Sequence, residues 1–431
     1  MDENETINRE HSLPGPDDVV VRTLPNGLTI LARENFSSPA VVASGLLRVG
    51  AQDEPEERAG LAALVASMLA RGTEQRSFDE INETIEGVGG SLAIAAGVHT
   101  TRFSFKSLAE DFPTLLGVLA DVVRNPTFPA DHLERVRAQR LTVLRERENN
   151  TQSVAERLFY EQAYPPGHPY HTPVDGTVES VEVLTRDDVV RFYERNYEPR
   201  DAIIVVVGAI PPTEAIAQVE QAFQDWANLE GRERAEIPPA GRPAEPVRAF
   251  RAVPGKTQSD IVIGAPAVSR TDPDYLPAYV ANTVLGVFGL MGRLGESVRD
   301  EQGLAYYARS SLDPAVSQGA WTATAGVAPD KVDQAVDTIL TEFARLGQEP
   351  VPGEELADSK SFLTGSLPLR LETNEGVARL LLDIMFYDLG LDYLQRYAAL
   401  INAIGPTEVQ RVAATYLEPS AYVLAVAGPP Q

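Results

Sequence analysis

The sequence predicts an α+β fold of two homologous domains, each with a mostly antiparallel or mixed β-sheet and helices packed on one face. An internal repeat is the first observation behind this prediction: residues 188–208 align without gaps with residues 408–428. Both segments have the pattern of a helix, a break at a Glu-Pro pair and an apolar strand that ends in glycine. The second observation is the order within each half, where strand patterns come early and longer helical patterns follow.

The domain boundaries follow from length and composition. The chain has 431 residues, and a domain takes roughly 100–200. Residues 228–247 are rich in Pro, Gly and charge and have no apolar period, which is typical of a linker. A repeat this long indicates two similar domains rather than a solenoid, whose units run about 20–50 residues. We therefore predict a tail over 1–18, an N-terminal domain over 19–227 and a C-terminal domain over 248–431.

The elements of the first half can be placed one by one. Residues 19–34 predict a β-hairpin that turns at Asn26-Gly27, and residues 40–50 predict another strand. Helical patterns follow over 60–71, 77–88, 110–124 and 130–149. A second, looser repeat has the pattern of a helix, a proline-containing loop and a helix, and it relates residues 112–141 to 332–363.

Composition excludes several classes of function. The hydrophobic content of 43% and the charged content of 23% are ordinary for a soluble globular protein. The net charge of −25 favours solubility and should repel nucleic acids and anionic membranes. The chain has no cysteine, which excludes disulfides and thiolate chemistry. No apolar run approaches the ~18 residues of a membrane span, and the acidic start lacks the pattern of a secretory signal, so we expect a cytoplasmic protein.

An ordered series of motifs resembles the pitrilysin/insulinase-type zinc metallopeptidases, the inverzincins. The motifs are ERAGLAALVASMLARGT, GVGGSL, NPTFP, LRERENN, GHPYHTPVDGT and YEPRDAIIVVVG. Within this family, the chain looks most similar to the non-zinc-binding subunit of bacterial heterodimers related to the mitochondrial processing peptidase. The resemblance covers nearly the whole chain after residue 18. It implies two homologous domains per chain and two chains that close around a peptide chamber.

The zinc motif of the family is degenerate in this chain. Active members carry His-x-x-Glu-His on a helix, where the two His, at i and i+4, share one face and grip zinc while the Glu acts as general base. The resemblance puts the two His positions on Ala63 and Ser67, and the Glu position on Ala66. The downstream zinc ligand falls on Glu146, which is still a glutamate. One carboxylate does not hold zinc usefully, so we expect no metal in this chain.

The remaining histidines do not suggest a relocated metal site. The chain has His11, His99, His132, His168 and His171. Only His168 and His171 are close in sequence, and Pro169 between them indicates a turn. A second loss accompanies that of the zinc motif: Ala93 stands where active relatives carry an Asn on the edge strand that pairs with substrate. The first half is therefore expected to lack two active-site features of the family together, the zinc motif and the Asn of the edge strand, rather than a single residue.

The second half keeps a pair that the family uses opposite the zinc. The resemblance assigns this pair to Arg299 and Tyr306, with Gly303 and Leu304 between them. A Tyr hydroxyl can donate to the oxyanion of a tetrahedral intermediate, and an Arg can bind substrate carbonyls or orient the donor. Adjacent strand residues point to opposite faces, so Tyr307 is the alternative exposed tyrosine.

A glycine-rich stretch lies just before this pair, over residues 285–295. A related non-zinc subunit has a substrate-binding loop here, which implies that Gly289 and Gly292 contact substrate. A helix end followed by a tight turn explains the glycines equally well. Both interpretations stay open at the level of sequence.

The leading hypothesis is a zinc-free, catalytically incomplete subunit of a heterodimeric metallopeptidase, inactive alone. Arg299 and Tyr306 would act in trans on unfolded peptides in a zinc-bearing homologous partner, and the chain itself would hold no cofactor. The alternative is a non-catalytic structural or peptide-binding scaffold of the same fold. An enzyme with relocated chemistry has little support, because the sequence offers no Cys and no Ser/His/Asp grouping.

Overall fold

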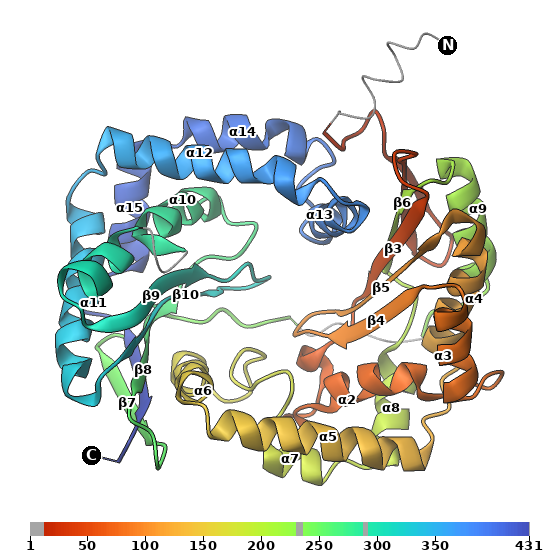
Figure 1. Ribbon diagram of the computed structural model, residues 1–431, viewed down its shortest axis with the longest axis horizontal. Helices are drawn as coiled ribbons and strands as arrows, with labels where there is room; N and C mark the ends of the chain where they lie inside the picture. Colours follow the sequence, from red (N-terminus) through yellow and green to blue (C-terminus); the bar gives the residue numbers. More distant parts are fainter. Residues whose placement is uncertain (1–12, 230–235, 288–291, 431) are drawn as a thin grey trace. The chain divides into compact units, whose positions relative to one another are not determined.

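A computed structural model describes residues 13–229, 236–287 and 292–430, and Figure 1 labels most of their helices and strands. The chain forms two compact units, and each takes residues from both halves of the sequence. Unit 1 consists of residues 1–142, 173–235 and 368–396, and unit 2 of residues 143–172, 236–367 and 397–431.

The strands of unit 1 form one mixed sheet. They are β1 (Val20–Thr23), β2 (Thr29–Glu34), β3 (Ala40–Leu47), β4 (Ser91–Ala96), β5 (Thr101–Leu108) and β6 (Ile203–Gly208). Their order is β1-β2-β6-β3-β5-β4, and only the β2–β6 pairing is parallel. The predicted hairpin is confirmed: β1 pairs antiparallel with β2, and Gly27 has a φ of 86°, which suits glycine.

Helices cover this sheet on both faces. Those that lie wholly or mostly in unit 1 are α2 (Leu61–Met68), α3 (Phe78–Gly87), α4 (Phe112–Arg124), α5 (Ala130–Glu148), α7 (Val178–Glu182), α8 (Arg186–Asn196), α9 (Pro212–Phe223) and α13 (Asn374–Phe386). Helix α13 packs on β3 and β6 through a core that includes Val377, Leu381 and Leu46. Helices α4 and α9 lie on the opposite face in Figure 1, which explains why every residue of β6 is buried.

Unit 2 repeats the same sheet without the first strand. Its strands are β7 (Val247–Ala252), β8 (Ser259–Pro266), β9 (Ala305–Leu312), β10 (Ala320–Val327) and β11 (Val423–Gly428). Their order is β7-β11-β8-β10-β9, with a parallel β7–β11 pairing and antiparallel pairings elsewhere. Strand β11 therefore lies between a parallel neighbour, β7, and an antiparallel one, β8, just as β6 lies between β2 and β3 in unit 1.

The helices of unit 2 pack on this second sheet. Those that lie wholly or mostly in unit 2 are α6 (Thr151–Ala163), α10 (Tyr275–Gly286), α11 (Val332–Gln348), α12 (Gly353–Arg370), α14 (Tyr393–Ala403) and α15 (Pro406–Tyr416). Helix α6 contacts β7, β8 and β11, while α11 contacts β8 and β10. Trp321 of β10 is fully buried in this core.

The structure confirms the α+β class and the internal repeat. Strand β6 begins at Ile203 and β11 at Val423, the same separation of 220 residues that aligns Asp188 with Glu408. One feature is additional: α6 comes from the first half of the sequence but packs on the sheet of unit 2, whereas α13 comes from the second half and packs on that of unit 1.

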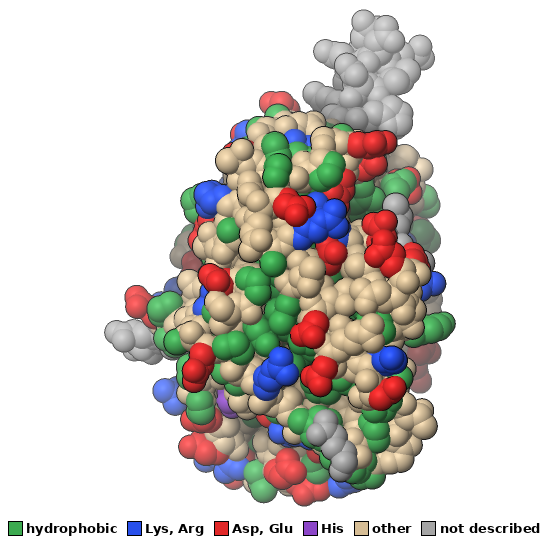
Figure 2. Space-filling model, turned by 90° about the vertical axis from the view of Figure 1, so that its left-hand side faces the viewer, with side chains coloured by type: hydrophobic (Ala, Val, Ile, Leu, Met, Phe, Trp, Pro, Cys, Tyr) green, Lys and Arg blue, Asp and Glu red, His purple; other side chains and the backbone are tan. Residues whose placement is uncertain are grey.

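Helix hydropathy and surface charge can be compared with the expectations from composition. Among the described residues, no helix combines the length and apolarity needed to cross a membrane. Figure 2 shows acidic and basic side chains spread between polar and apolar ones over one face of the molecule, without a large basic field.

Candidate functional site

The helix that matches the zinc motif, α2, is short and apolar, and nearly all of its residues are buried. It begins after Gly60, whose φ is 92°. A Cβ on Gly60 would lie 2.8 Å from the carbonyl oxygen of Asp175. Glycine is therefore required at this position for two reasons: the backbone is left-handed, and the 175–176 turn approaches it closely.

The carboxylate of Glu54 caps the start of α2. Its two oxygens accept hydrogen bonds from the backbone N–H groups of Gly60, at 3.0 Å, and Ala62, at 2.6 Å. These N–H groups have no partner within the helix, so the contact satisfies them. Burial nevertheless raises the pKa of Glu54 to about 8, because desolvation outweighs the stabilising N–H groups and the nearby Arg140.

This carboxylate predicts a pH-dependent stability. A folded-state pKa of about 8, above the usual 4.5, means that Glu54 stabilises the fold most below pH 4.5 and that this contribution is lost as the pH rises through 8. Each pH unit carries at most about 1.4 kcal/mol. Between pH 5 and pH 9 the wild type should therefore lose up to about 4 kcal/mol more unfolding free energy than Glu54→Gln.

Urea unfolding at both pH values measures this difference. The exposed Glu57 provides the control, since Glu57→Gln should keep the wild-type pH dependence. An equal decline in the wild type and Glu54→Gln would contradict the assignment.

The two His positions and the Glu position of the motif carry no metal ligand. Ala63 and Ala66 are 5% and 3% exposed and present methyl groups. Ser67 donates its hydroxyl to the carbonyl oxygen of Ala63 at 2.8 Å. Zinc needs imidazole, thiolate or carboxylate donors, so the side chains present do not fit a metal. Across the described residues, no group of three or more His, Cys, Asp or Glu is arranged to hold one.

A guanidinium contacts the two former His positions. Arg140, on α5, donates from Nη2 to the hydroxyl of Ser67 at 2.9 Å and to the carbonyl oxygen of Ala63 at 3.1 Å. Its Nη1 lies 2.6 Å from a carboxylate oxygen of Asp175. The Arg140 side chain is only 14% exposed, so its charge belongs to the interior of unit 1.

Glu146, the predicted remnant of the downstream ligand, lies near the end of α5 with an exposed side chain. Six residues separate it from Arg140, which places the two side chains about 120° apart around the helix. The residue of α5 that touches Ala63 and Ser67 is Arg140, and Glu146 points in a different direction.

The two closely spaced histidines make backbone contacts. His168 Nε2 donates to the carbonyl oxygen of Pro238 at 3.0 Å, and His171 Nδ1 donates to that of Tyr164 at 2.7 Å. Both side chains therefore help to fold the loop after α6, as the Pro169 turn suggested.

Arg299 and Tyr306 both lie on irregular backbone in unit 2. Arg299 belongs to a π-helix over Gly295–Glu301 that packs against β9, and its side chain is 37% exposed. A turn at Gly303, whose φ is 60°, leads into β9. Such π-helices are rare and often mark functional sites.

Tyr306 sits at a β-bulge at the start of β9. Gly326 of β10 pairs with Tyr307 and Val327 pairs with Ala305, so Tyr306 has no partner in this register. Its side chain is 88% exposed. Bulges often re-aim a side chain beside an active site, and here the bulge directs the tyrosine to the surface.

The neighbouring Tyr307 points the other way. Its hydroxyl donates to a carboxylate oxygen of Asp260 at 2.6 Å, and the Thr151 hydroxyl donates to the second oxygen of the same carboxylate. Desolvation, reinforced by Asp260, raises the pKa of Tyr307 well above its usual value. Tyr306 is therefore the exposed tyrosine of the pair, while Tyr307 makes a hydrogen bond within unit 2.

Of the two glycines predicted to contact substrate, one lies among the described residues and the other does not. Gly289 lies outside the described residues. Gly292 has a φ of 96°, and a Cβ there would lie 2.5 Å from the Cα of Gly286 at the end of α10. Backbone packing thus accounts for glycine at this position, and the predicted contact with substrate stays a prediction.

Strand β4 lies at the edge of the unit 1 sheet and carries Ala93. It pairs with β5 on one side only, and its residues alternate between exposed and partly buried. An edge strand of small residues leaves backbone N–H and C=O groups open to another extended chain.

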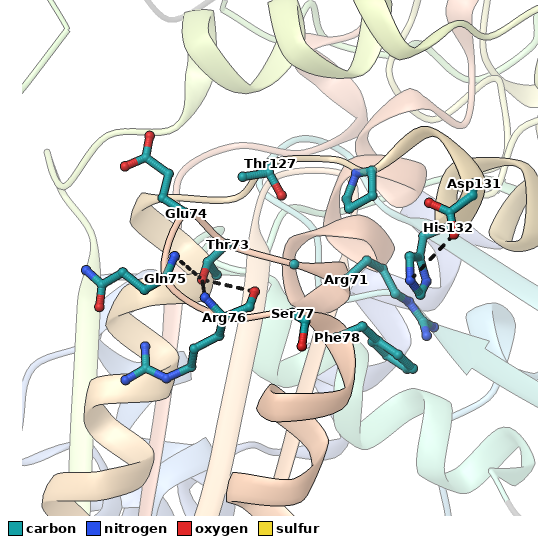
Figure 3. A pocket seen from close by; sticks show the side chains of 12 residues that line it. Arg71, Thr73, Glu74, Gln75, Arg76, Ser77, Phe78, Thr127, Asp131 and His132 are labelled. Carbon is teal, nitrogen blue, oxygen red and sulfur yellow. Dashed lines mark hydrogen bonds and ion pairs between the residues drawn. The ribbon is translucent and has the colours of Figure 1, made fainter.

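A pocket of about 370 Å³ in unit 1 is lined by other residues than these. Figure 3 shows Arg71, Phe78 and His132 on one side of it; the Arg71 guanidinium lies 4.7 Å from the Phe78 ring centre. On the other side, Arg76 is paired with Asp121 at 2.5 Å. The pocket is lined by Arg71, Gly72, Thr73, Glu74, Gln75, Arg76, Ser77, Phe78, Thr127, Pro129, Asp131 and His132. Its mixed, partly paired charges favour no ligand class.

Comparisons with known proteins identify the family of this chain. Residues 30–172 match the family model of insulinase (peptidase family M16), and residues 184–363 match that of the peptidase M16 inactive domain. An uncharacterized zinc protease of Streptomyces coelicolor is 28% identical over 81% of this chain and 76% of its own. An Arabidopsis thaliana protein named "Probable mitochondrial-processing peptidase subunit beta" is 23% identical over 98% of this chain and 81% of its own.

Solved structures share the fold. A peptidase M16 inactive domain from Pseudomonas fluorescens superposes with a TM-score of 0.87 at 24% identity, covering 96% of this chain and 98% of that one. A protease from Helicobacter pylori gives a TM-score of 0.88 at 20% identity, covering 97% and 100%. With two family models that together span most of the sequence, the chain belongs to peptidase family M16.

Proposed function

We propose that this chain is the zinc-free subunit of a heterodimeric M16 metallopeptidase and supplies Arg299 and Tyr306 to a zinc-bearing homologous partner. The observation that carries the proposal is the α2 helix, where Ala63, Ala66 and Ser67 stand in place of the metal-binding and proton-transferring residues. Hydrolysis by this complex would use a metal held by the other chain.

The exposed Tyr306 supports a role in trans. A phenol at a bulge on the edge strand β9 is free to donate to an oxyanion that forms on a peptide carbonyl. Arg299, on the neighbouring π-helix, can bind a substrate carbonyl with its fixed fork of donors. The open edge of β4 supports binding of unfolded peptides as an added strand.

Reconstitution tests this proposal. The chain would be purified alone and together with each His-x-x-Glu-His homologue from the same genome, and hydrolysis of an unstructured quenched-fluorescence peptide would be measured with zinc present. We expect no activity from the chain alone. The correct mixture should exceed its homologue alone by at least about 10²-fold, the typical contribution of an oxyanion donor.

The alternative scaffold function predicts a different result. Sedimentation would then show a homodimer or a complex without any gain in hydrolysis. That outcome would overturn the proposed catalytic role. Fluorescence anisotropy with a labelled unstructured peptide would then measure whether the chain binds peptides.

A further inference from the structure

We propose that Arg140 replaces the metal of this fold: its guanidinium ties α5 to α2, the two helices that zinc would otherwise join, and its charge keeps divalent cations out. This inference rests on the family assignment and on the contacts of unit 1, and it does not require the proposed partnership. It assigns to Arg140 a role that the α5 sequence does not reveal.

The contacts of Arg140 join three segments of unit 1. Nη2 binds the Ser67 hydroxyl and the Ala63 carbonyl of α2, while Nη1 binds the Asp175 carboxylate of the turn before α7. The turn itself packs tightly on the start of α2, because a Cβ on Gly176 would lie 2.4 Å from the carbonyl oxygen of Ala59. One side chain from α5 therefore fixes both α2 and this turn.

The local chemistry suits an organic cation that donates hydrogen bonds better than a metal ion. The acceptors of the guanidinium N–H groups are a hydroxyl, a backbone carbonyl and the Asp175 carboxylate, and the Glu54 carboxyl lies nearby. Arginine stays protonated in proteins, so the positive charge is permanent. A zinc ion brought against Ser67 would face this charge at a few ångströms, where two like charges repel strongly.

The first experiment tests the structural role by thermal unfolding of the full chain. Arg140→Leu leaves Ser67, Ala63 and Asp175 without their donor, so the Tm should fall by about 5 °C or more. Arg135, on the same helix and 70% exposed, is the matched control, and Arg135→Leu should change the Tm by about 1 °C at most. Equal Tm values for the wild type and Arg140→Leu would overturn this part of the proposal.

The second experiment tests metal exclusion. Ala63→His, Ala66→Glu and Ser67→His would be combined, with Arg140 retained or replaced by Leu, and zinc per chain would be measured by mass spectrometry after dialysis against buffered zinc. We expect the form with Arg140→Leu to bind zinc at least about tenfold more tightly. Equal affinity in the two forms would overturn the exclusion.

A smaller pair of variants protects the test against misfolding. If circular dichroism shows that the triple variant is unfolded, Ala63→His/Ser67→His is compared with and without Arg140→Leu, using Co²⁺ absorption as the readout. Stronger binding without Arg140 supports the proposal, and no difference contradicts it. Neither readout depends on peptidase activity, so failure here is distinguishable from failure of the proposed heterodimer.

Discussion

Under the proposed function, replacement of Tyr306 by phenylalanine is expected to lower the peptidase activity of the reconstituted complex by about 10²–10³-fold, because the proposed oxyanion donor is lost. The loss should appear in kcat, with little change in KM, since the hydroxyl would bind the transition state more strongly than the substrate. The side chain is 88% exposed at a bulge, so the unfolding free energy of the chain should stay unchanged. Initial rates over a range of peptide concentrations measure both constants.

The adjacent tyrosine provides the matched control. Tyr307→Phe removes the hydrogen bond to Asp260, so it should lower the stability of unit 2 by about 1–2 kcal/mol. Its effect on kcat should be much smaller than that of Tyr306→Phe. If the two variants lost activity equally while both stayed folded, Tyr306 would have no special place in the reaction.

Replacement of Trp321 by alanine is expected to have the largest effect on stability. The indole is fully buried in β10, and its Nε1 donates to the side-chain oxygen of Asn282 at 2.9 Å. The cavity should cost about 3–5 kcal/mol, and the buried, unpaired Asn282 should cost about 1–3 kcal/mol more. We expect the Tm to fall by about 10 °C or more, measured by circular dichroism.

Two variants separate these contributions. Trp321→Phe keeps most of the ring but loses the N–H donor, so it should cost clearly less than Trp321→Ala. The other tryptophan of the chain, Trp226, is only partly buried, and Trp226→Ala should be milder than Trp321→Ala. An equal fall in Tm for Trp321→Ala and Trp226→Ala would show that burial in the β10 core contributes less to stability than we expect.

Much of the local structure could be predicted from the sequence. The Asn26-Gly27 turn, the helix over 78–87 and the repeat with a separation of 220 residues depend on turn chemistry, capping and periodicity, which act between near neighbours. The absence of metal-binding side chains at Ala63, Ala66 and Ser67 can be read directly from the sequence, while their match to the zinc motif stays a prediction from the resemblance.

The role of Arg140 could not be predicted. Helix α5 also carries Arg135, Arg137 and Arg145 in the same charged pattern, and nothing local distinguishes the arginine that reaches Ser67. The contact between Arg140 and Asp175, which are 35 residues apart in the sequence, depends on the packing of α2 against the 175–176 turn. The same holds for Glu54, whose raised pKa comes from burial rather than from its neighbours in sequence.

Residue identity and periodicity are enough to predict a repeated α+β chain of a peptidase family in which the helix at the expected zinc site has no metal-binding side chains. Which side chains fill that site, and which way they point, depends on tertiary packing. The bulge that exposes Tyr306 and the exchange of α6 and α13 between sheets arise from pairing and packing between residues far apart in the chain, where side-chain patterns alone do not specify the partner.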